Sequence, residues 1–190
     1  GRHKITDLTL VEPMVTWVEG GVVISATIDS NLGVIEKSWS IDEANGRVVL
    51  SYKLHWKEIG LGSLRLGHIT LNPEIFDEDS LRFSTHNGGN DLDKFQLLGS
   101  EFDHGRAISS LISANHAIGM TEGVVEIGDK MRSLNITVNK TQAAVVGLLT
   151  YRKVKDKYFC RLALSAKEID DTCKETHDGP IAFEMEINCQ

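Results

Sequence analysis

Alternation of apolar and polar residues with a period of two is the feature that most limits what this chain can fold into. Near the C-terminus the apolar members of one such run are Ile181, Phe183, Met185 and Ile187. The segment 133–139 repeats the pattern. Successive side chains of a β-strand point to opposite faces of its sheet, so these runs predict strands with one buried face. Helical periodicity is scarce, and we therefore expect an all-β fold.

Turns that contain glycine separate the predicted strands. Glu19-Gly20-Gly21 lies between strands predicted at 15–18 and 22–28, as expected of a hairpin. A second turn, 42–46, is rich in Asn and Gly and separates predicted strands. The remaining strands are predicted at 5–11, 33–41, 47–56, 63–71, 81–84, 94–97, 123–127, 143–151 and 157–165. Short helical segments are predicted at 109–117 and 166–173.

The number of strands predicts the architecture. About a dozen strands are too many for one twisted sheet, which curls or splits into two packed sheets near ten strands. No linker, low-complexity segment or repeat divides the 190 residues. We therefore expect residues 1–190 to form a single domain, a large antiparallel β-sandwich with few short helices. At this length the fold buries roughly 70% of the unfolded surface and needs no disulfide or metal staple.

The charge and cysteine content exclude several classes of protein. A net charge of −7 leaves no basic groove, so we expect neither nucleic acid nor an anionic membrane as a partner. The apolar run 143–149 is far too short to span a bilayer. The three cysteines, Cys160, Cys173 and Cys189, have no CxxC spacing and are expected to be reduced thiols. With no signal peptide at the start, the sequence predicts a cytoplasmic protein.

Metal and cofactor motifs are missing from the sequence. No pair among the seven histidines has the HxH or HExxH spacing of metal ligands, so we expect no metal site. The chain has no P-loop, GxGxxG, GxSxG or cysteine-nucleophile motif, and we expect no cofactor. Gly60, Gly62 and Gly67 lie among strand residues, which favours bulges or close strand contact over phosphate binding.

A polar turn after the predicted strand 81–84 is the first candidate binding site. His86 and Asn87 stand directly before Gly88 and Gly89, which let the backbone take positive φ values and let another group approach closely. An imidazole and an amide on a fixed platform can donate and accept hydrogen bonds, as recognition of sugar hydroxyls requires. The alternative is that these residues only hold their own loop together.

Two further loops carry groups suited to acid–base chemistry or ligand binding. Asp103, His104 and Arg106 offer a carboxylate, an imidazole and a guanidinium at a predicted loop tip, and the alternative is a solvated charged turn. His116 and Glu122 flank a glycine-bearing bend and could face one cavity as a catalytic acid–base pair. The competing interpretation is that the residues at this bend only satisfy backbone groups.

The three tryptophans differ in their surroundings. Trp56 alternates with charged neighbours, so we expect it on an exposed face, where an indole can stack against a pyranose ring. We expect Trp17 in the core, where tryptophans are more often found. The chain also has 27 carboxylates, any two of which could flank a glycosidic bond, and sequence alone does not choose between them.

The run from Val48 to Phe95 resembles the C-terminal β-domain of large retaining α-glycosidases of the family-57 and family-38 type. The resemblance is carried by Trp56, by the glycine-rich segment 60–68 and by the segment 81–89, with a similar run at 122–129. It implies a galactose mutarotase-like supersandwich that packs against a catalytic α/β barrel of the same polypeptide. That barrel and its paired carboxylates are not among these residues, so the resemblance does not imply catalysis by this chain.

Three functions therefore stay open. The first is an accessory domain of a glycoside hydrolase, which supports the barrel and contacts carbohydrate through polar loops. The second is a sugar mutarotase or epimerase acting by itself, which opens a sugar ring with an imidazole and a carboxylate. The third is a β-sandwich interaction module without sugar chemistry. A polar cleft with His and Glu in contact favours the second, and a large exposed apolar patch favours a missing partner domain.

Overall fold

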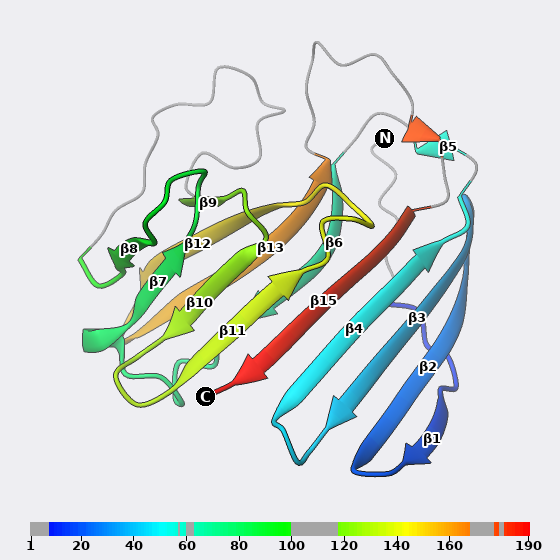
Figure 1. Cartoon of the computed structure of the whole chain (residues 1–190), viewed down its shortest axis with the longest axis horizontal. Coiled ribbons are helices and arrows are strands. Elements are labelled where there is room, and N and C mark those ends of the chain that lie inside the picture. Colours follow the sequence, from blue (N-terminus) through cyan, green and yellow to red (C-terminus); the bar gives the residue numbers. More distant parts are fainter. Residues whose placement is uncertain (1–7, 57, 60–62, 100–117, 168–176, 179–180) are drawn as a thin grey trace.

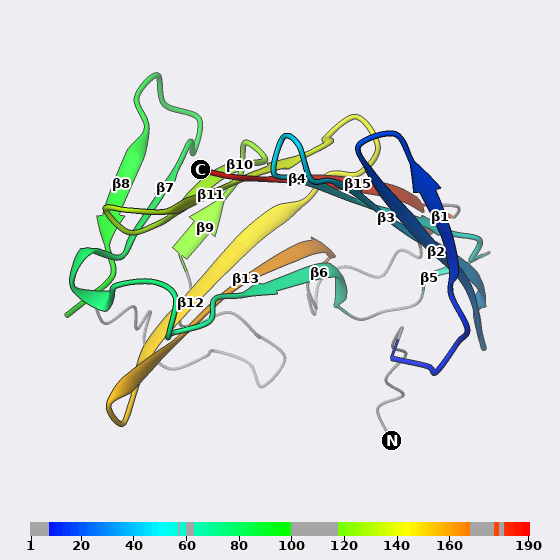
Figure 2. The ribbon, with the colours of Figure 1, turned by 90° about the horizontal axis from the view of Figure 1, so that it is seen from below.

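A computed structural model describes residues 8–56, 58–59, 63–99, 118–167, 177–178 and 181–190 (Figure 1). These residues form two packed layers of antiparallel strands (Figure 2). The larger layer is a nine-stranded sheet and the smaller a four-stranded sheet, with an additional two-stranded pair. The predicted all-β sandwich is thereby confirmed.

The nine-stranded sheet contains β1 (Met14–Val18), β2 (Gly21–Ser30), β3 (Gly33–Asp42), β4 (Arg47–Leu54), β15 (Ile181–Cys189), β11 (Ser133–Val138), β10 (Val124–Gly128), β7 (Arg82–Thr85) and β8 (Asp93–Gln96), in this spatial order. The four-stranded sheet contains β6 (Leu64–Thr70), β13 (Lys157–Lys167), β12 (Val146–Val154) and β9 (Ile118–Met120). The two-stranded pair is β14 (His177–Asp178) with β5 (Glu58–Ile59).

Helical structure is sparse in the described part of the chain. It consists of one 3₁₀ turn, η1 (Glu78–Ser80), between β6 and β7. The helical segment predicted at 109–117 lies outside the described residues. Of the helical segment predicted at 166–173, residues 166–167 are described, and they form the end of strand β13. The strand predicted at 5–11 is wrong in its described part, because residues 8–11 form no strand. No helix among the described residues is long and apolar enough to cross a membrane.

Strand β15 joins the two halves of the large sheet. It pairs with β4 on one side and with β11 on the other, so Ile187 lies opposite both Val48 and Ile136. The hairpins β1–β2–β3–β4 come from the start of the chain, and β11, β10, β7 and β8 come from its middle. The sheet is therefore continuous only through residues late in the sequence (Figure 1).

The first hairpins require glycine at one tight contact. Gly33, at the start of β3, has a φ of +140°, and a Cβ atom there would lie 2.4 Å from the carbonyl oxygen of His55. The same Cβ would lie 3.4 Å from Cδ1 of Trp56. The β2–β3 turn therefore packs directly on the segment that follows β4.

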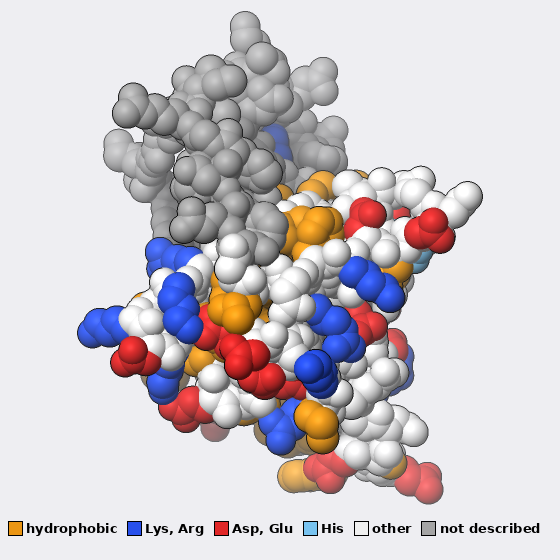
Figure 3. All heavy atoms as spheres, turned by 90° about the vertical axis from the view of Figure 1, so that its left-hand side faces the viewer, with side chains coloured by type: hydrophobic (Ala, Val, Ile, Leu, Met, Phe, Trp, Pro, Cys, Tyr) orange, Lys and Arg blue, Asp and Glu red, His pale blue; other side chains and the backbone are white. Residues whose placement is uncertain are grey.

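The two edges of the large sheet differ in character. Charged side chains of both signs spread over the end of the molecule that carries β7 and β8 (Figure 3). At the opposite end, β1 has no charged residue and all five of its residues are exposed. Strands β1–β3 extend to one side beyond the four-stranded sheet (Figures 1 and 2).

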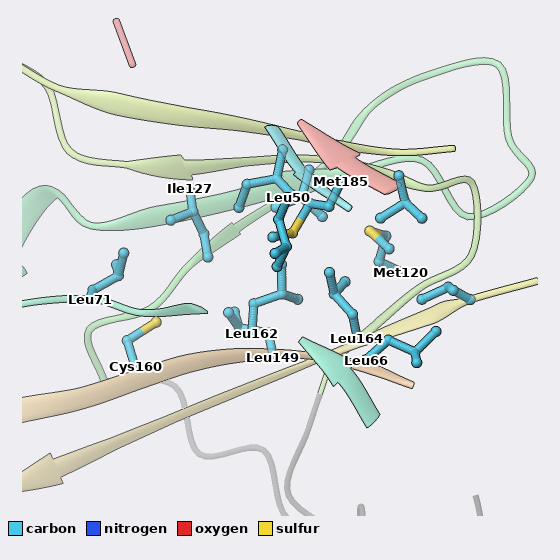
Figure 4. Packing of buried hydrophobic residues seen from close by; sticks show 14 of the residues in the cluster. Leu50, Leu66, Leu71, Met120, Ile127, Leu149, Cys160, Leu162, Leu164 and Met185 are labelled. Atoms are coloured by element: carbon cyan, nitrogen blue, oxygen red, sulfur yellow. The ribbon is translucent and has the colours of Figure 1, made fainter. Parts of the chain in front are cut away.

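The core lies between the two sheets. Leu50 and Met185 of the large sheet point toward Leu149 and Leu162 of the small sheet (Figure 4). Met185 is 1% exposed, which confirms the period-two prediction for β15. The largest fully buried side chains are Phe83, Phe183, Leu81, Leu97, Met120, Ile127, Ile136, Leu149, Leu162, Leu164, Met185 and Val125.

A buried carboxylate fixes the connection that leads into β7. Asp129, in the turn between β10 and β11, accepts hydrogen bonds from the backbone N–H groups of Asp77 at 2.8 Å, Met131 at 2.7 Å and Arg132 at 2.8 Å. Burial would raise the pKa of Asp129, but these three donors hold that pKa below its ordinary value. The carboxylate therefore ties the β10–β11 turn to η1.

A second polar contact joins η1 to the small sheet. Glu78 accepts a hydrogen bond of 2.6 Å from the hydroxyl of Tyr151 and forms an ion pair with Lys153, both on β12. Burial and the neighbouring carboxylate together raise the pKa of Tyr151. The segment before β7 is thus held to both sheets, and β7 places the first candidate site.

Candidate functional site

The predicted contact residues His86 and Asn87 lie where β7 ends at one rim of the sandwich. Thr85, the last residue of β7, is fully buried, and its hydroxyl donates a 2.9 Å hydrogen bond to the carbonyl oxygen of Val124. The chain then turns away from the sheet, and Gly88 takes a φ of +86°. Such a φ suits glycine. The buried strand end therefore holds His86 and Asn87 in place at the surface.

The amide of Asn87 connects the two sheets. Its Nδ2 donates to the carbonyl oxygen of Gly119 in β9 at 3.2 Å and to the carboxylate of Asp93 in β8 at 3.4 Å. Its Oδ1 accepts from the backbone N–H of Thr121 at 3.1 Å and from the Thr121 hydroxyl at 3.4 Å. Asn87 is therefore engaged within the protein, as the alternative sequence interpretation held.

His86 and Glu122 meet at this same rim. The backbone N–H of Glu122 donates to the carbonyl oxygen of His86 at 3.4 Å, and the Glu122 carboxylate pairs with Lys140 at 3.1 Å. No hydrogen bond from another described residue fixes the imidazole of His86. We call the set of His86, Asn87, Asp93, Thr121 and Glu122 the polar rim.

The side chains of the polar rim are better suited to ligand binding than to catalysis. Its exposed carboxylates can accept hydrogen bonds, and the His86 imidazole can donate or accept. The Thr121 hydroxyl donates to Asn87 and can still accept from a ligand, so the rim suits a polyhydroxylated ligand. Two hollows on the described surface lie elsewhere: one of about 530 Å³ beside the β12–β13 turn, and one of about 490 Å³ beside Trp17.

The structure corrects the predicted exposure of two tryptophans. Trp56 is 8% exposed and belongs to the core cluster, so it presents no stacking face to a sugar. Its indole nitrogen has no hydrogen-bond partner within the described structure. Trp17 is 76% exposed on β1, although the sequence predicted it in the core. The exposure of the two tryptophans is therefore the reverse of what the sequence predicted.

Four of the predicted site residues belong to the segment 100–117. Asp103, His104, Arg106 and His116 all lie outside the described residues. The pairing predicted between His116 and Glu122 therefore stays a prediction. In the described ranges, no group of three or more His, Cys, Asp or Glu residues is arranged to hold a metal ion.

Sequence reasoning missed the partners that complete the polar rim. Asp93 and Thr121, and Lys140, which pairs with Glu122 of the rim, lie on three different segments, and their proximity depends on β9 crossing to the small sheet. The three-residue strand β9 has no alternating run long enough to be predicted. An Asn followed by a glycine pair was the one local signal, since such an amide commonly bonds to nearby backbone.

The two predicted contact residues should respond differently to truncation. We expect Asn87→Ala to lower the free energy of unfolding by about 1–2 kcal/mol, because contacts between the sheets are lost. We expect His86→Ala to change this free energy by less than about 0.5 kcal/mol, because the imidazole makes no hydrogen bond to another described residue. Urea denaturation of both variants measures this, and equal losses would show that the His86 side chain is structural.

A second surface carries apolar residues that the fold does not cover. Along the segment that enters the sandwich and along β1, the exposed large apolar side chains are Leu8, Leu10, Met14, Val15, Trp17 and Val18. Their exposed fractions run from 49% for Val18 to 100% for Leu10. We call these residues the N-terminal apolar surface. It lies at the far end of the large sheet from the polar rim (Figure 1).

Comparison with known proteins defines the fold. No protein-family model matches the sequence, and no curated protein matches it either. Among solved structures, the chain is similar to a candidate aldose 1-epimerase from Escherichia coli K12, with 13% sequence identity and a TM-score of 0.52. The likeness covers 95% of this chain and 69% of the other. At that identity it concerns the fold alone, and the chain is therefore an antiparallel sandwich with the galactose mutarotase-like fold.

Proposed function

We propose that this chain is a non-catalytic module of a carbohydrate-active enzyme, which packs against the catalytic domain of the same polypeptide. The N-terminal apolar surface is the observation that carries the proposal. Six large apolar side chains, each at least 49% exposed, occur between residues 8 and 18, on both faces of β1 and on the segment just before it. Soluble monomers seldom expose so many large apolar side chains within so short a segment, and exposed apolar surface of this extent commonly binds another protein.

The position of this surface suits a preceding domain. The surface is carried by residues 8–18, which come before all the other strands of the sandwich in sequence, so a domain that precedes this one in the polypeptide is joined on the side of the chain that carries it. The resemblance of the sequence to C-terminal domains of family-57 and family-38 type glycosidases agrees with that order. The galactose mutarotase-like fold agrees with a role in carbohydrate metabolism, although a fold does not by itself determine a function.

Two measurements test the accessory role. The open reading frame that encodes the chain should extend upstream into a barrel domain with paired carboxylates. Acrylamide quenching of Trp17, taken as the difference between the protein and its Trp17→Phe variant, should be strong in the isolated 190 residues and weak in the longer protein. A frame without such a domain, or equal quenching in both proteins, would overturn the proposal.

The polar rim is the proposed point of carbohydrate contact. In the full-length enzyme, His86→Ala should weaken binding of an oligosaccharide substrate about tenfold, because an exposed hydrogen-bonding group is lost from a folded domain. Lys94→Ala, on the neighbouring β8, serves as an exposed control and should leave binding unchanged. Isothermal titration measures both, and unchanged binding by His86→Ala would remove this residue from the site.

A mutarotase remains the second candidate, because the polar rim carries both an imidazole, on His86, and a carboxylate, on Glu122, and the backbones of these two residues are hydrogen-bonded. In that reaction a base removes the proton of the anomeric hydroxyl while an acid protonates the ring oxygen, and reclosure gives the other anomer. Polarimetry of fresh α-D-galactose with the purified chain is expected to match the buffer blank. A rate that rises in proportion to protein concentration would favour the mutarotase over the accessory domain.

A further inference from the structure

We propose that the partner domain binds this module by adding an extended strand, bracketed by basic residues, to the free edge of β1. The inference rests on the proposed function and states how the two domains join. It is drawn from three independent properties of β1: its unprotected edge, its exposure on both faces and the charges at its two ends.

The edge of β1 lacks the protection that the other sheet edges have. Natural proteins blunt edge strands with charge, with proline inside the strand or by making the strand very short. Strand β8 carries Asp93 and Lys94, β6 carries Arg65, and β9 is three residues long. Strand β1 reads Met-Val-Thr-Trp-Val, without a charge or a proline. Of the four edge strands of the two larger described sheets, β1 alone is neither charged nor as short as three residues.

The side chains of β1 are exposed on both faces of the sheet. Met14, Thr16 and Val18 share one face, and Val15 and Trp17 share the other, and all five are exposed. A partner that packed flat against the sheet would cover one of these faces and leave the other in water. A strand added alongside β1 places side chains next to both sets, because cross-strand neighbours alternate between the faces.

Among the described residues, β1 has a paired strand on one side only. Its register with β2 runs from Met14 opposite Ser25 to Val18 opposite Gly21, and β1 stands last in the sheet order. In an antiparallel pair, every second residue directs its N–H and C=O groups away from the neighbouring strand. Those groups on β1 can receive the main-chain hydrogen bonds of an added strand.

The charges around β1 select the kind of strand. Exposed Glu12 and Glu19 bracket it, and exposed Glu43 lies at the adjoining turn, where its N–H donates to the carbonyl oxygen of Gly20. None of the three forms an ion pair with another described residue. In an antiparallel pair of two copies, Glu12 of each would approach Glu19 of the other, which is repulsive. A strand flanked by Lys or Arg is instead complementary.

The test uses a synthetic peptide as the added strand. The probe is acetyl-Lys-Thr-Val-Thr-Val-Thr-Lys-amide, followed by Trp17 fluorescence and by hydrogen exchange of the β1 amides. We expect saturable binding that protects β1 and weakens with salt. A peptide with N-methylated valines should bind about tenfold more weakly, and so should one with Glu in place of both Lys residues. Binding that ignores N-methylation would overturn strand addition.

Variants of the protein locate the site. Val15→Lys places a charge on β1, repels the basic peptide and should weaken its binding at least about tenfold. Val146→Lys is the matched control, because Val146 is 44% exposed on an interior strand and Val15 is 50% exposed on the edge. Equal binding by both variants would overturn the assignment to β1. Circular dichroism confirms that each variant is folded.

Other results separate this inference from the proposed function. Light scattering that shows a dimer, dissociated by Val15→Lys but not by Val146→Lys, would make a second copy the occupant and overturn the inference. If the reading frame does contain a barrel domain while the basic peptide fails to bind, the accessory role stands and strand addition fails. If the peptide binds and the frame lacks that domain, the accessory role fails while β1 remains a strand acceptor.

Discussion

Replacement of Phe83 by alanine is expected to lower the free energy of unfolding by about 4 kcal/mol. Phe83 is fully buried in β7, opposite Ile127 of β10, and its ring centroid lies 6.1 Å from that of Phe95. The variant loses the transfer free energy of the ring and leaves a cavity that its packed neighbours fill only in part. Urea denaturation should show a lower midpoint with an unchanged slope.

Phe159→Ala is the matched control for this prediction. Phe159 is half-buried on the outer face of the small sheet, with the guanidinium groups of Arg152 and Arg161 at 5.2 Å and 4.9 Å from its ring centroid. Its truncation should cost about 1 kcal/mol, chiefly in cation–π contact. Equal losses for Phe83→Ala and Phe159→Ala would contradict the placement of Phe83 in the core.

Replacement of Asp129 by alanine is expected to cost about 3 kcal/mol, the second largest effect. Asp129 is 3% exposed, and the N–H groups of Asp77, Met131 and Arg132 all lose their acceptor in the variant. Asp129→Asn should cost about half as much, because its amide keeps one oxygen and turns an NH₂ group toward the other donors. Thermal and urea denaturation at neutral pH measure both.

Acidification should reduce the advantage of the native Asp129. The folded-state pKa of its carboxyl group lies below the ordinary value of 3.8, so its stabilisation is fully present above that pH and is lost as the pH falls through the lowered pKa. The difference in free energy of unfolding between the native protein and Asp129→Asn should therefore shrink below about pH 4. Exposed Asp91→Asn is the control. A difference that stays constant to about pH 2 would show that the charge contributes nothing.

Local sequence pattern predicted most of the fold because burial follows alternation within a strand. Phe183 and Met185 are buried as the pattern of β15 required, and Glu19 and Gly20 form the turn between β1 and β2. Short strands escaped prediction. Strand β9, at three residues, and β5 and β14, at two residues each, carry too little sequence for a period to show.

Trp17 and Trp56 show where alternation fails. A period of two tells which residues share a face of a sheet, but not whether another layer covers that face. Trp17 sits in a regular strand at an edge, and the small sheet does not extend over it. Trp56 follows the end of β4, where the chain leaves the strand and the alternation with charged neighbours no longer sets its direction. Burial of both residues depends on tertiary placement.

The candidate site was predictable only in part for the same reason. The polar, glycine-paired turn after β7 marked His86 and Asn87 as residues presented at a strand end. The sequence did not show that the Asn87 amide would form hydrogen bonds with Gly119 and Thr121, because those residues approach it from the other sheet. The proximity of Glu122 to His86 has the same origin. Contacts between sheets join residues far apart in sequence, and no local pattern encodes them.

The central place of β15 bears on how the nascent chain matures. Residues 181–189 follow every other strand of the large sheet in sequence, yet they fill its middle, between β4 and β11. Until the ribosome has made them, both of these neighbours keep an open edge, and open edges invite aggregation. Pairing at such sequence separation is also slow. Chaperone occupancy during that interval should therefore govern the yield of native protein.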